Sequence, residues 1–188
     1  MRAHHLSLAV VAVLSFTACG DDGGGGDDDT AAATCESYCD TVTANCTAAE
    51  SQYTNRDQCL AVCATFEQGT AGAMSGNNLE CRTYHAGAAN GDPATHCVHA
   101  GPGGAGACGA NCEGFCTLVL DTCTGADEVY ADMAACMTAC AGFDATEKYD
   151  VSDTSGDTFA CRLYHASVAT SDSGTHCPHT GEVSATCN

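Results

Sequence analysis

Two segments of this sequence carry the same potentially reactive side chains at the same spacing. The first, CRTYHAGAANGDPATHCVHAG, covers residues 81–101, and the second, CRLYHASVATSDSGTHCPHTG, covers residues 161–181. Ten of their nineteen non-cysteine positions are identical. Across residues 35–66, by contrast, only seven of 27 non-cysteine positions match their partners in the second copy. The histidine-rich block therefore tolerates less change than its surroundings, which indicates that its side chains matter individually.

Each block contains three histidines, and imidazole nitrogen is a donor that both copper and zinc accept in proteins. The histidines are His85, His96 and His99 in the first block and His165, His176 and His179 in the second. Asp92 is a candidate fourth ligand or hydrogen-bond partner of a ligand. The interpretation that we favour from sequence is structural: histidine and tyrosine hydrogen-bond backbone groups in a small core. Haem or another ligand is a third reading, although the covalent haem motif C-x2-C-H is absent.

The elements that would position these histidines are short. Residues 81–89 are expected to form a helix that ends near Asn90 and Gly91, because an Asn-Gly pair favours the end of a helix. The rest of the block is expected to be an irregular loop. Arg82 could pair with Asp92 and hold that loop against the helix.

Cysteine spacing shows that the histidine block belongs to a larger repeated unit. The first unit has its eight cysteines at successive steps of 4, 7, 13, 4, 18, 16 and 11 residues, and the second at 4, 7, 13, 4, 21, 16 and 10. Only two loop lengths differ, which is a strong signal of an internal repeat. We place the first repeat at residues 35–108 and the second at residues 109–188.

Within each unit the spacing favours a helical hairpin closed by two disulfides. Cysteines four apart lie one helical turn apart, so each C-x3-C pair presents its sulfurs on one face. Antiparallel helices pair positions whose residue numbers have a constant sum, which favours the pairs Cys35–Cys63, Cys39–Cys59, Cys112–Cys140 and Cys116–Cys136. The other four cysteines of each unit can pair among themselves in three ways; they are Cys46, Cys81, Cys97 and Cys108, and Cys123, Cys161, Cys177 and Cys187. The expected fold class is small, all-α and disulfide-rich, with two tandem repeats of a helical hairpin, a third short helix and a loop.

Composition explains why the chain needs so many cross-links. Its 188 residues include 17 cysteines but no tryptophan and no isoleucine. Such a chain buries too little apolar surface to offset its conformational entropy without disulfides, and disulfides persist in oxidising compartments. The formal net charge of −19 excludes ordinary nucleic-acid binding, which requires a basic face.

The first 34 residues are typical of an export and anchoring segment. Residues 1–18 combine Arg2 with a short apolar run, as a signal peptide does. They end at the sequence FTAC, which resembles the lipobox of bacterial lipoproteins. That resemblance implies that Cys19 becomes the lipidated first residue of the mature protein, and subtracting Cys19 leaves an even sixteen cysteines. Residues 19–34 are rich in glycine and aspartate, which predicts a disordered tether.

The remainder of the chain resembles Cys-rich bacterial lipoproteins with paired CRxYHA…HCxHxG units, a resemblance that implies no particular activity. We therefore expect a non-catalytic binding or structural module, anchored at Cys19 to the extracytoplasmic side of the bacterial cell envelope, with no cofactor. No motif of a nucleophilic enzyme or of a phosphate-binding loop is present in the sequence. The alternative is an envelope metal-binding protein for copper or zinc. The sequence leaves open the ligand or protein partner, the choice of inner or outer membrane, and the oligomeric state.

Lipidation of Cys19 can be tested by substitution. The Cys19→Ala protein should leave the membrane fraction, because it has lost the only residue that the lipobox offers for acylation. Fractionation and intact-mass measurement of the wild type provide the check. A mutant that stays in the membrane, together with a wild type that carries no lipid mass, would contradict the expectation.

Overall fold

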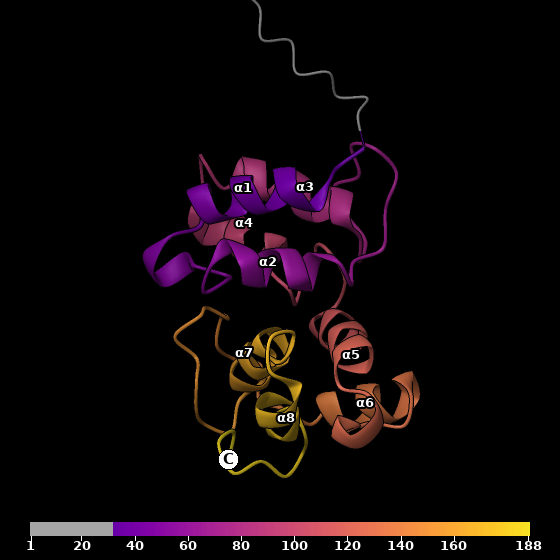
Figure 1. Cartoon of the computed structure of the whole chain (residues 1–188). Coiled ribbons are helices and arrows are strands. Elements are labelled where there is room, and N and C mark those ends of the chain that lie inside the picture. The colour runs from indigo at the N-terminus through magenta and orange to yellow at the C-terminus, as the bar shows by residue number, and fades with distance from the viewer. Residues whose placement is uncertain (1–31) are drawn as a thin grey trace, which may run out of the picture.

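A computed structural model describes residues 32–188 of the chain. The proposed signal peptide, Cys19 and nearly all of the tether lie outside these residues. Figure 1 shows two groups of helices, one built from the first repeat and one from the second. No helix in residues 32–188 combines the length and apolarity needed to cross a bilayer.

Repeat 1 contains four α-helices rather than three. They are α1 (Cys35–Asn45), α2 (Arg56–Cys63), α3 (Leu79–Ala88) and α4 (Pro93–Ala100), with a short 3-10 turn η1 (Ala48–Glu50) between the first two. The segment expected as an irregular loop thus forms a helix of its own, α4. It begins at Asp92, whose side chain accepts a hydrogen bond from the Thr95 N–H, and proline occupies its first position. Both features are common at helix starts.

Repeat 2 follows the same order with a shorter final element. Its elements are α5 (Asn111–Thr122), η2 (Gly125–Asp127), α6 (Met133–Cys140), α7 (Phe159–Ala169), α8 (Ser173–His176) and η3 (Cys177–His179). Proline at position 178 follows α8, and the chain continues there as a 3-10 turn instead of a longer helix. Among the described residues the structure has no β-strand, only an isolated bridge between Asp144 and Thr158. The small, disulfide-rich, all-α fold class is confirmed.

All sixteen cysteines of residues 32–188 form disulfides within their own repeat. The hairpins are closed by the pairs that the spacing favours, Cys35–Cys63 and Cys39–Cys59 in repeat 1 and Cys112–Cys140 and Cys116–Cys136 in repeat 2. Of the three arrangements left open for the other cysteines, both repeats adopt the same one. The pairs are Cys46–Cys97 and Cys81–Cys108, and Cys123–Cys177 and Cys161–Cys187. The helices that carry the histidines are therefore tied covalently to the hairpin and to the end of each repeat.

A buried arginine holds each repeat together from inside, and it does not pair with Asp92 as the sequence suggested. The Arg82 side chain is 0% exposed, donates to the carbonyl oxygens of Asn78, Gly101 and Pro102, and donates to Asn77 Oδ1 at 2.8 Å. Its guanidinium carbon lies 4.0 Å from the centre of the Phe66 ring. The Asp92 side chain instead accepts a hydrogen bond from the Thr95 N–H at the start of α4. Five fixed N–H donors can satisfy several carbonyls at once, which explains an arginine here better than a surface ion pair does.

The same arrangement recurs in repeat 2 with one change. Arg162 donates to the carbonyls of Thr158, Gly181 and Cys187 and stacks on Phe143 at 4.1 Å. Its terminal nitrogen bonds Asp157 Oδ1 at 2.8 Å, where repeat 1 has the neutral Asn77. The buried positive charge is therefore directly compensated only in repeat 2.

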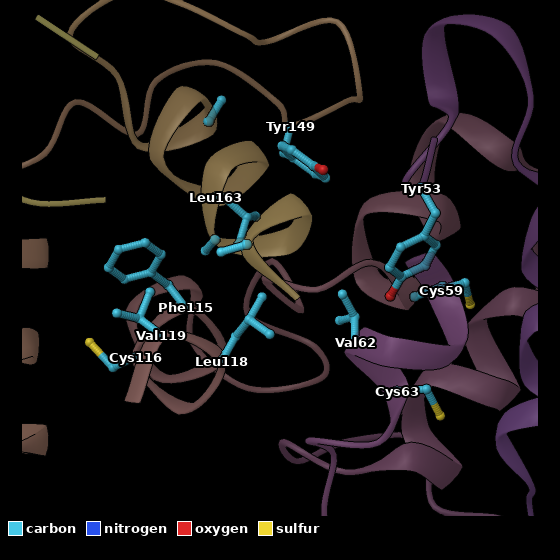
Figure 2. Packing of buried hydrophobic residues seen from close by; sticks show 14 of the residues in the cluster. Tyr53, Cys59, Val62, Cys63, Phe115, Cys116, Leu118, Val119, Tyr149 and Leu163 are labelled. Carbon is cyan, nitrogen blue, oxygen red and sulfur yellow. The ribbon is translucent and has the colours of Figure 1, made fainter. Parts of the chain in front are cut away.

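The two repeats pack together through a loop as well as through apolar side chains. Gln52 donates from Nε2 to the Tyr149 carbonyl at 3.2 Å, and the Tyr149 hydroxyl donates to the Gln52 carbonyl at 3.3 Å. Beside this pair, Val62 on α2 points toward repeat 2, where Leu118 and Leu163 lie (Figure 2). Loop residues 144–157 of repeat 2 thus reach across to repeat 1.

The disulfides can be counted in solution. The oxidised Cys19→Ala protein should release no free thiol when it is denatured without reductant, because every remaining cysteine is bridged. Reduction should abolish the helical circular-dichroism signal, since each disulfide of this kind stabilises a small domain by roughly 2–4 kcal/mol. Several free thiols per chain, or a helical signal that survives reduction, would show that the cross-links do not carry the fold.

Candidate histidine sites

The site in repeat 1 forms where α3 and α4 meet. His85 lies in the last turn of α3, and His96 and His99 are three residues apart on α4. Residues three apart lie on the same side of a helix, so α4 presents two imidazoles together toward α3. Between them Cys97 is fully buried and bonded to Cys46 at the end of α1, which fixes the rotation of α4 about its axis.

The three rings of repeat 1 converge on one another. The Nδ1 atoms of His85 and His96 lie 2.8 Å apart, and the ring of His99 stands edge-on to that of His85 with centres 4.8 Å apart. One nitrogen from each ring lies within 4.8 Å of a nitrogen of the other two. All three histidines that the sequence proposed for this site are therefore brought together.

Repeat 2 reproduces the arrangement with different helices. The Nδ1 atoms of His165 and His176 are 2.9 Å apart, and the ring centres of His165 and His179 are 4.7 Å apart. The gap between the second and third rings is slightly wider than in repeat 1, 6.5 Å against 6.1 Å. The first two rings thus keep their geometry although α4 has become the short helix α8 followed by the turn η3. Among the described residues, however, only repeat 1 brings one nitrogen of each of its three rings within 4.8 Å of the others. We call the two groups triad 1 and triad 2.

Hydrogen bonding in triad 2 indicates which nitrogens are free to bind a cation. His165 Nε2 lies 3.3 Å from the Thr154 carbonyl oxygen, which can only accept, so this nitrogen carries the proton. Nδ1 of a neutral His165 then presents its lone pair to His176. In triad 1 the corresponding atom, His85 Nε2, is buried and makes no hydrogen bond of good geometry, although the Met74 backbone is close enough to His85 to raise its pKa. The third ring of each triad also has a buried nitrogen without a partner, Nδ1 of His99 and of His179.

Burial favours the neutral form of His85, His99, His165 and His176 by lowering their pKa values. It lowers the pKa of His165 to about 4, and the neighbouring His179 and His176 oppose protonation further. The pKa values of His85 and His99 are also lowered, in both cases mainly by burial, with His99 and His96 respectively as the next cause. Lys148, which reaches across from repeat 2 and bonds the Ala94 carbonyl, lowers the pKa of His99 as well. Neutral imidazole is the form that binds metal, so these shifts favour ligation at ordinary pH.

Two groups near the triads are not available as metal ligands. Sulfurs of the Cys81–Cys108 disulfide lie within 4.8 Å of a His85 nitrogen, and those of Cys161–Cys187 lie equally close to His165, but bridged sulfur is not a thiolate. Asp92, proposed from sequence as a fourth ligand, caps α4 instead. The disulfide beside each triad was not anticipated. The four-residue step from Cys81 to His85, repeated from Cys161 to His165, was the available signal for it.

Protonation of the triads should be visible in the stability of the metal-free protein. Unfolded imidazoles protonate near pH 6.5, whereas the folded His165 resists protonation down to about pH 4. The unfolded chain therefore binds more protons in this interval, and stability is expected to fall as the pH drops from 6.5 toward 4. Thermal unfolding of the wild type and of His165→Gln measures this effect. Carboxylates titrate in both proteins, so the glutamine variant should show a shallower slope, and equal slopes would contradict the assignment.

Comparison with known proteins places the repeats in a family. The profile described as the BfoA family C-terminal domain matches the chain twice, over residues 24–111 and over residues 110–187. No curated protein and no solved structure gives a significant match. The two matched segments contain all six histidines of the triads and both cysteine repeats. The chain therefore belongs to the BfoA family, whose C-terminal domain it carries in two successive copies.

Proposed function

We propose that this chain is a non-catalytic, extracytoplasmic lipoprotein, tethered to the envelope membrane at Cys19, that binds copper or zinc ions at triads 1 and 2. The observation that carries the metal assignment is the close approach of two Nδ1 atoms, 2.8 Å and 2.9 Å, with a third imidazole beside them in each repeat. Because of this arrangement we favour metal binding over the purely structural role that the sequence favoured.

The ring positions are close to those that a metal would require. Two nitrogens bound to one tetrahedral zinc at 2.0–2.1 Å lie about 3.3 Å apart. The Nδ1 atoms of His85 and His96 would therefore need to separate by about half an ångström, and a small change in side-chain torsion supplies that. His99 would complete the set with its unpartnered Nδ1. Burying such a nitrogen without a partner costs roughly 1–3 kcal/mol, and a metal ion would remove that cost.

The environment of the sites suits a cation carrier outside the cytoplasm. Eight disulfides in the described residues indicate an oxidising environment. The chain has 24 acidic residues against five basic ones, and two of those five, Arg82 and Arg162, are buried. The surrounding surface is therefore strongly negative and attracts cations over nucleic acid or acidic partners. The proposed tether would hold this surface at the membrane.

A structural role for the triads is the competing explanation, and one specific observation favours it. Each Nδ1–Nδ1 contact is a good hydrogen bond between neutral imidazoles, one donating and one accepting, which needs no metal. In that case His85→Ala should lower the free energy of unfolding by roughly 1–3 kcal/mol through lost or unsatisfied hydrogen bonds. Metal content would not change.

Metal titration separates these two explanations. Oxidised wild-type protein should bind Cu²⁺ or Zn²⁺ at close to two ions per chain, and His96→Ala combined with His176→Ala should abolish tight binding. These two side chains are only half-buried, so their removal is expected to leave the fold intact. Affinity should fall as acid protonates the imidazoles, at a pH below their ordinary value of about 6.5, because burial lowers the pKa values of His85, His99, His165 and His176.

A matched control keeps the rings beside the triads but changes no ligand. Tyr84→Phe combined with Tyr164→Phe removes only the hydroxyl groups of the rings that stand edge-on to His85 and His165, so this variant should bind metal as the wild type does. Calorimetry and metal analysis after gel filtration give the affinity and stoichiometry. Absence of binding tighter than micromolar in the wild type would leave only the structural explanation.

A further inference from the structure

Triad 1 offers three donors and no fourth. Within residues 32–188, no carboxylate, free thiol or additional histidine joins His85, His96 and His99 in the group of nitrogens that could hold an ion. Structural zinc sites are usually closed by four protein ligands, whereas sites that exchange or activate a bound molecule keep a position open. The number of protein ligands therefore indicates whether a bound ion would be structural or would exchange.

The nearest candidates for a fourth ligand are all engaged elsewhere. Asp92 and Asp172 accept the N–H groups of Thr95 and Thr175 at the starts of α4 and α8, each at 3.2 Å. The sulfurs closest to His85 and His165 belong to disulfides. Lys148, near His99, is cationic and bonds the Ala94 carbonyl. The disulfide sulfurs and the cationic Lys148 are not ligands for a metal ion, and neither aspartate belongs to a group of donors that could hold one.

Access to the triads is one-sided. His85 and His165 are buried at 7% and 5% exposure and rest against the disulfides of their repeats. His96, His99, His176 and His179 are only half-buried, so the outer side of each triad faces solvent. A molecule from outside could approach an ion on that side without any rearrangement of the buried ring.

The fold does not depend on the ion. Helix α4 is held by the Cys46–Cys97 disulfide and by its own cap, and the segment after it is held by Arg82 through the carbonyls of Gly101 and Pro102. Zinc-dependent small domains differ, because metal binding supplies their folding energy. Here an ion can leave without the elements coming apart.

We propose that each loaded triad keeps one coordination position free for a single donor atom from another molecule, so that metal enters and leaves by ligand exchange rather than serving as a structural ion. This inference rests on the metal-binding function proposed above. It makes the chain a transfer site: an incoming nitrogen, oxygen or sulfur donor binds the open position first, and imidazoles are then released one at a time. No electron transfer is required, since only ligands change.

Cobalt-loaded protein tests the open position directly, with inorganic azide as the external donor. Oxidised wild type loaded with Co²⁺ should change its visible absorption saturably on addition of azide. A chelator should remove the ion within minutes, far faster than the protein unfolds. Circular dichroism before and after removal should be the same. A spectrum unaffected by azide, or release that occurs only on unfolding, would overturn the inference while leaving metal binding intact.

Asp92→Asn combined with Asp172→Asn is the matched variant. Asparagine retains an oxygen that can cap α4 and α8, so the fold is preserved while the carboxylates are lost. If the position is open in the wild type, the cobalt spectrum and the azide response should be unchanged. A stronger azide response in the variant would show that aspartate fills the position and would overturn the inference. Failure of the wild type to take up cobalt, zinc or copper would instead overturn the proposed function itself.

Discussion

The Cys46–Cys97 disulfide is the constraint on which the candidate site depends. Cys97 lies between His96 and His99 on α4, and its bond to the end of α1 turns one face of α4 inward. Two positions three residues apart on that helix then meet His85 on α3. Repeat 2 uses the Cys123–Cys177 bond in the same way, although α8 is only four residues long. A covalent bond, rather than packing of large apolar residues, therefore sets the geometry of each triad.

The features of this fold that depend on local periodicity could be predicted from the sequence. The helical hairpin follows from cysteines one turn apart, because only one antiparallel register aligns both C-x3-C pairs. Arg82 was misassigned to Asp92 because the two are close in sequence, whereas its partners are mostly backbone carbonyls, which no sequence pattern reveals. Asp92 carried a signal that was missed, since Asp followed by Pro is a common start for a helix. The pairing of Cys46 with Cys97 could not be chosen from parity alone.

The sequence predicted the three histidines as a group, but it did not predict that their side chains lie close together. The repeated spacing identified His85, His96 and His99 as residues that matter individually, but not whether they touch. Contact required α4 to be a helix and to be rotated by its disulfide, and both are properties of the assembled repeat. The buried nitrogens without partners likewise emerge only from the packed structure.

The two repeats are similar in sequence but not interchangeable in the molecule, because their contact is one-directional. Val62 on α2 of repeat 1 points toward repeat 2, on the side where Leu118 and Leu163 lie (Figure 2). At the positions equivalent to these two leucines, repeat 1 has Thr41 and Thr83.

Repeat 1 therefore has threonine where repeat 2 has leucine, and the Thr83 hydroxyl is itself buried. At the position equivalent to Val62, repeat 2 has the smaller Ala139. Neither repeat therefore carries both halves of this contact, and the packing of Val62 near Leu118 and Leu163 is specific to repeat 1 followed by repeat 2.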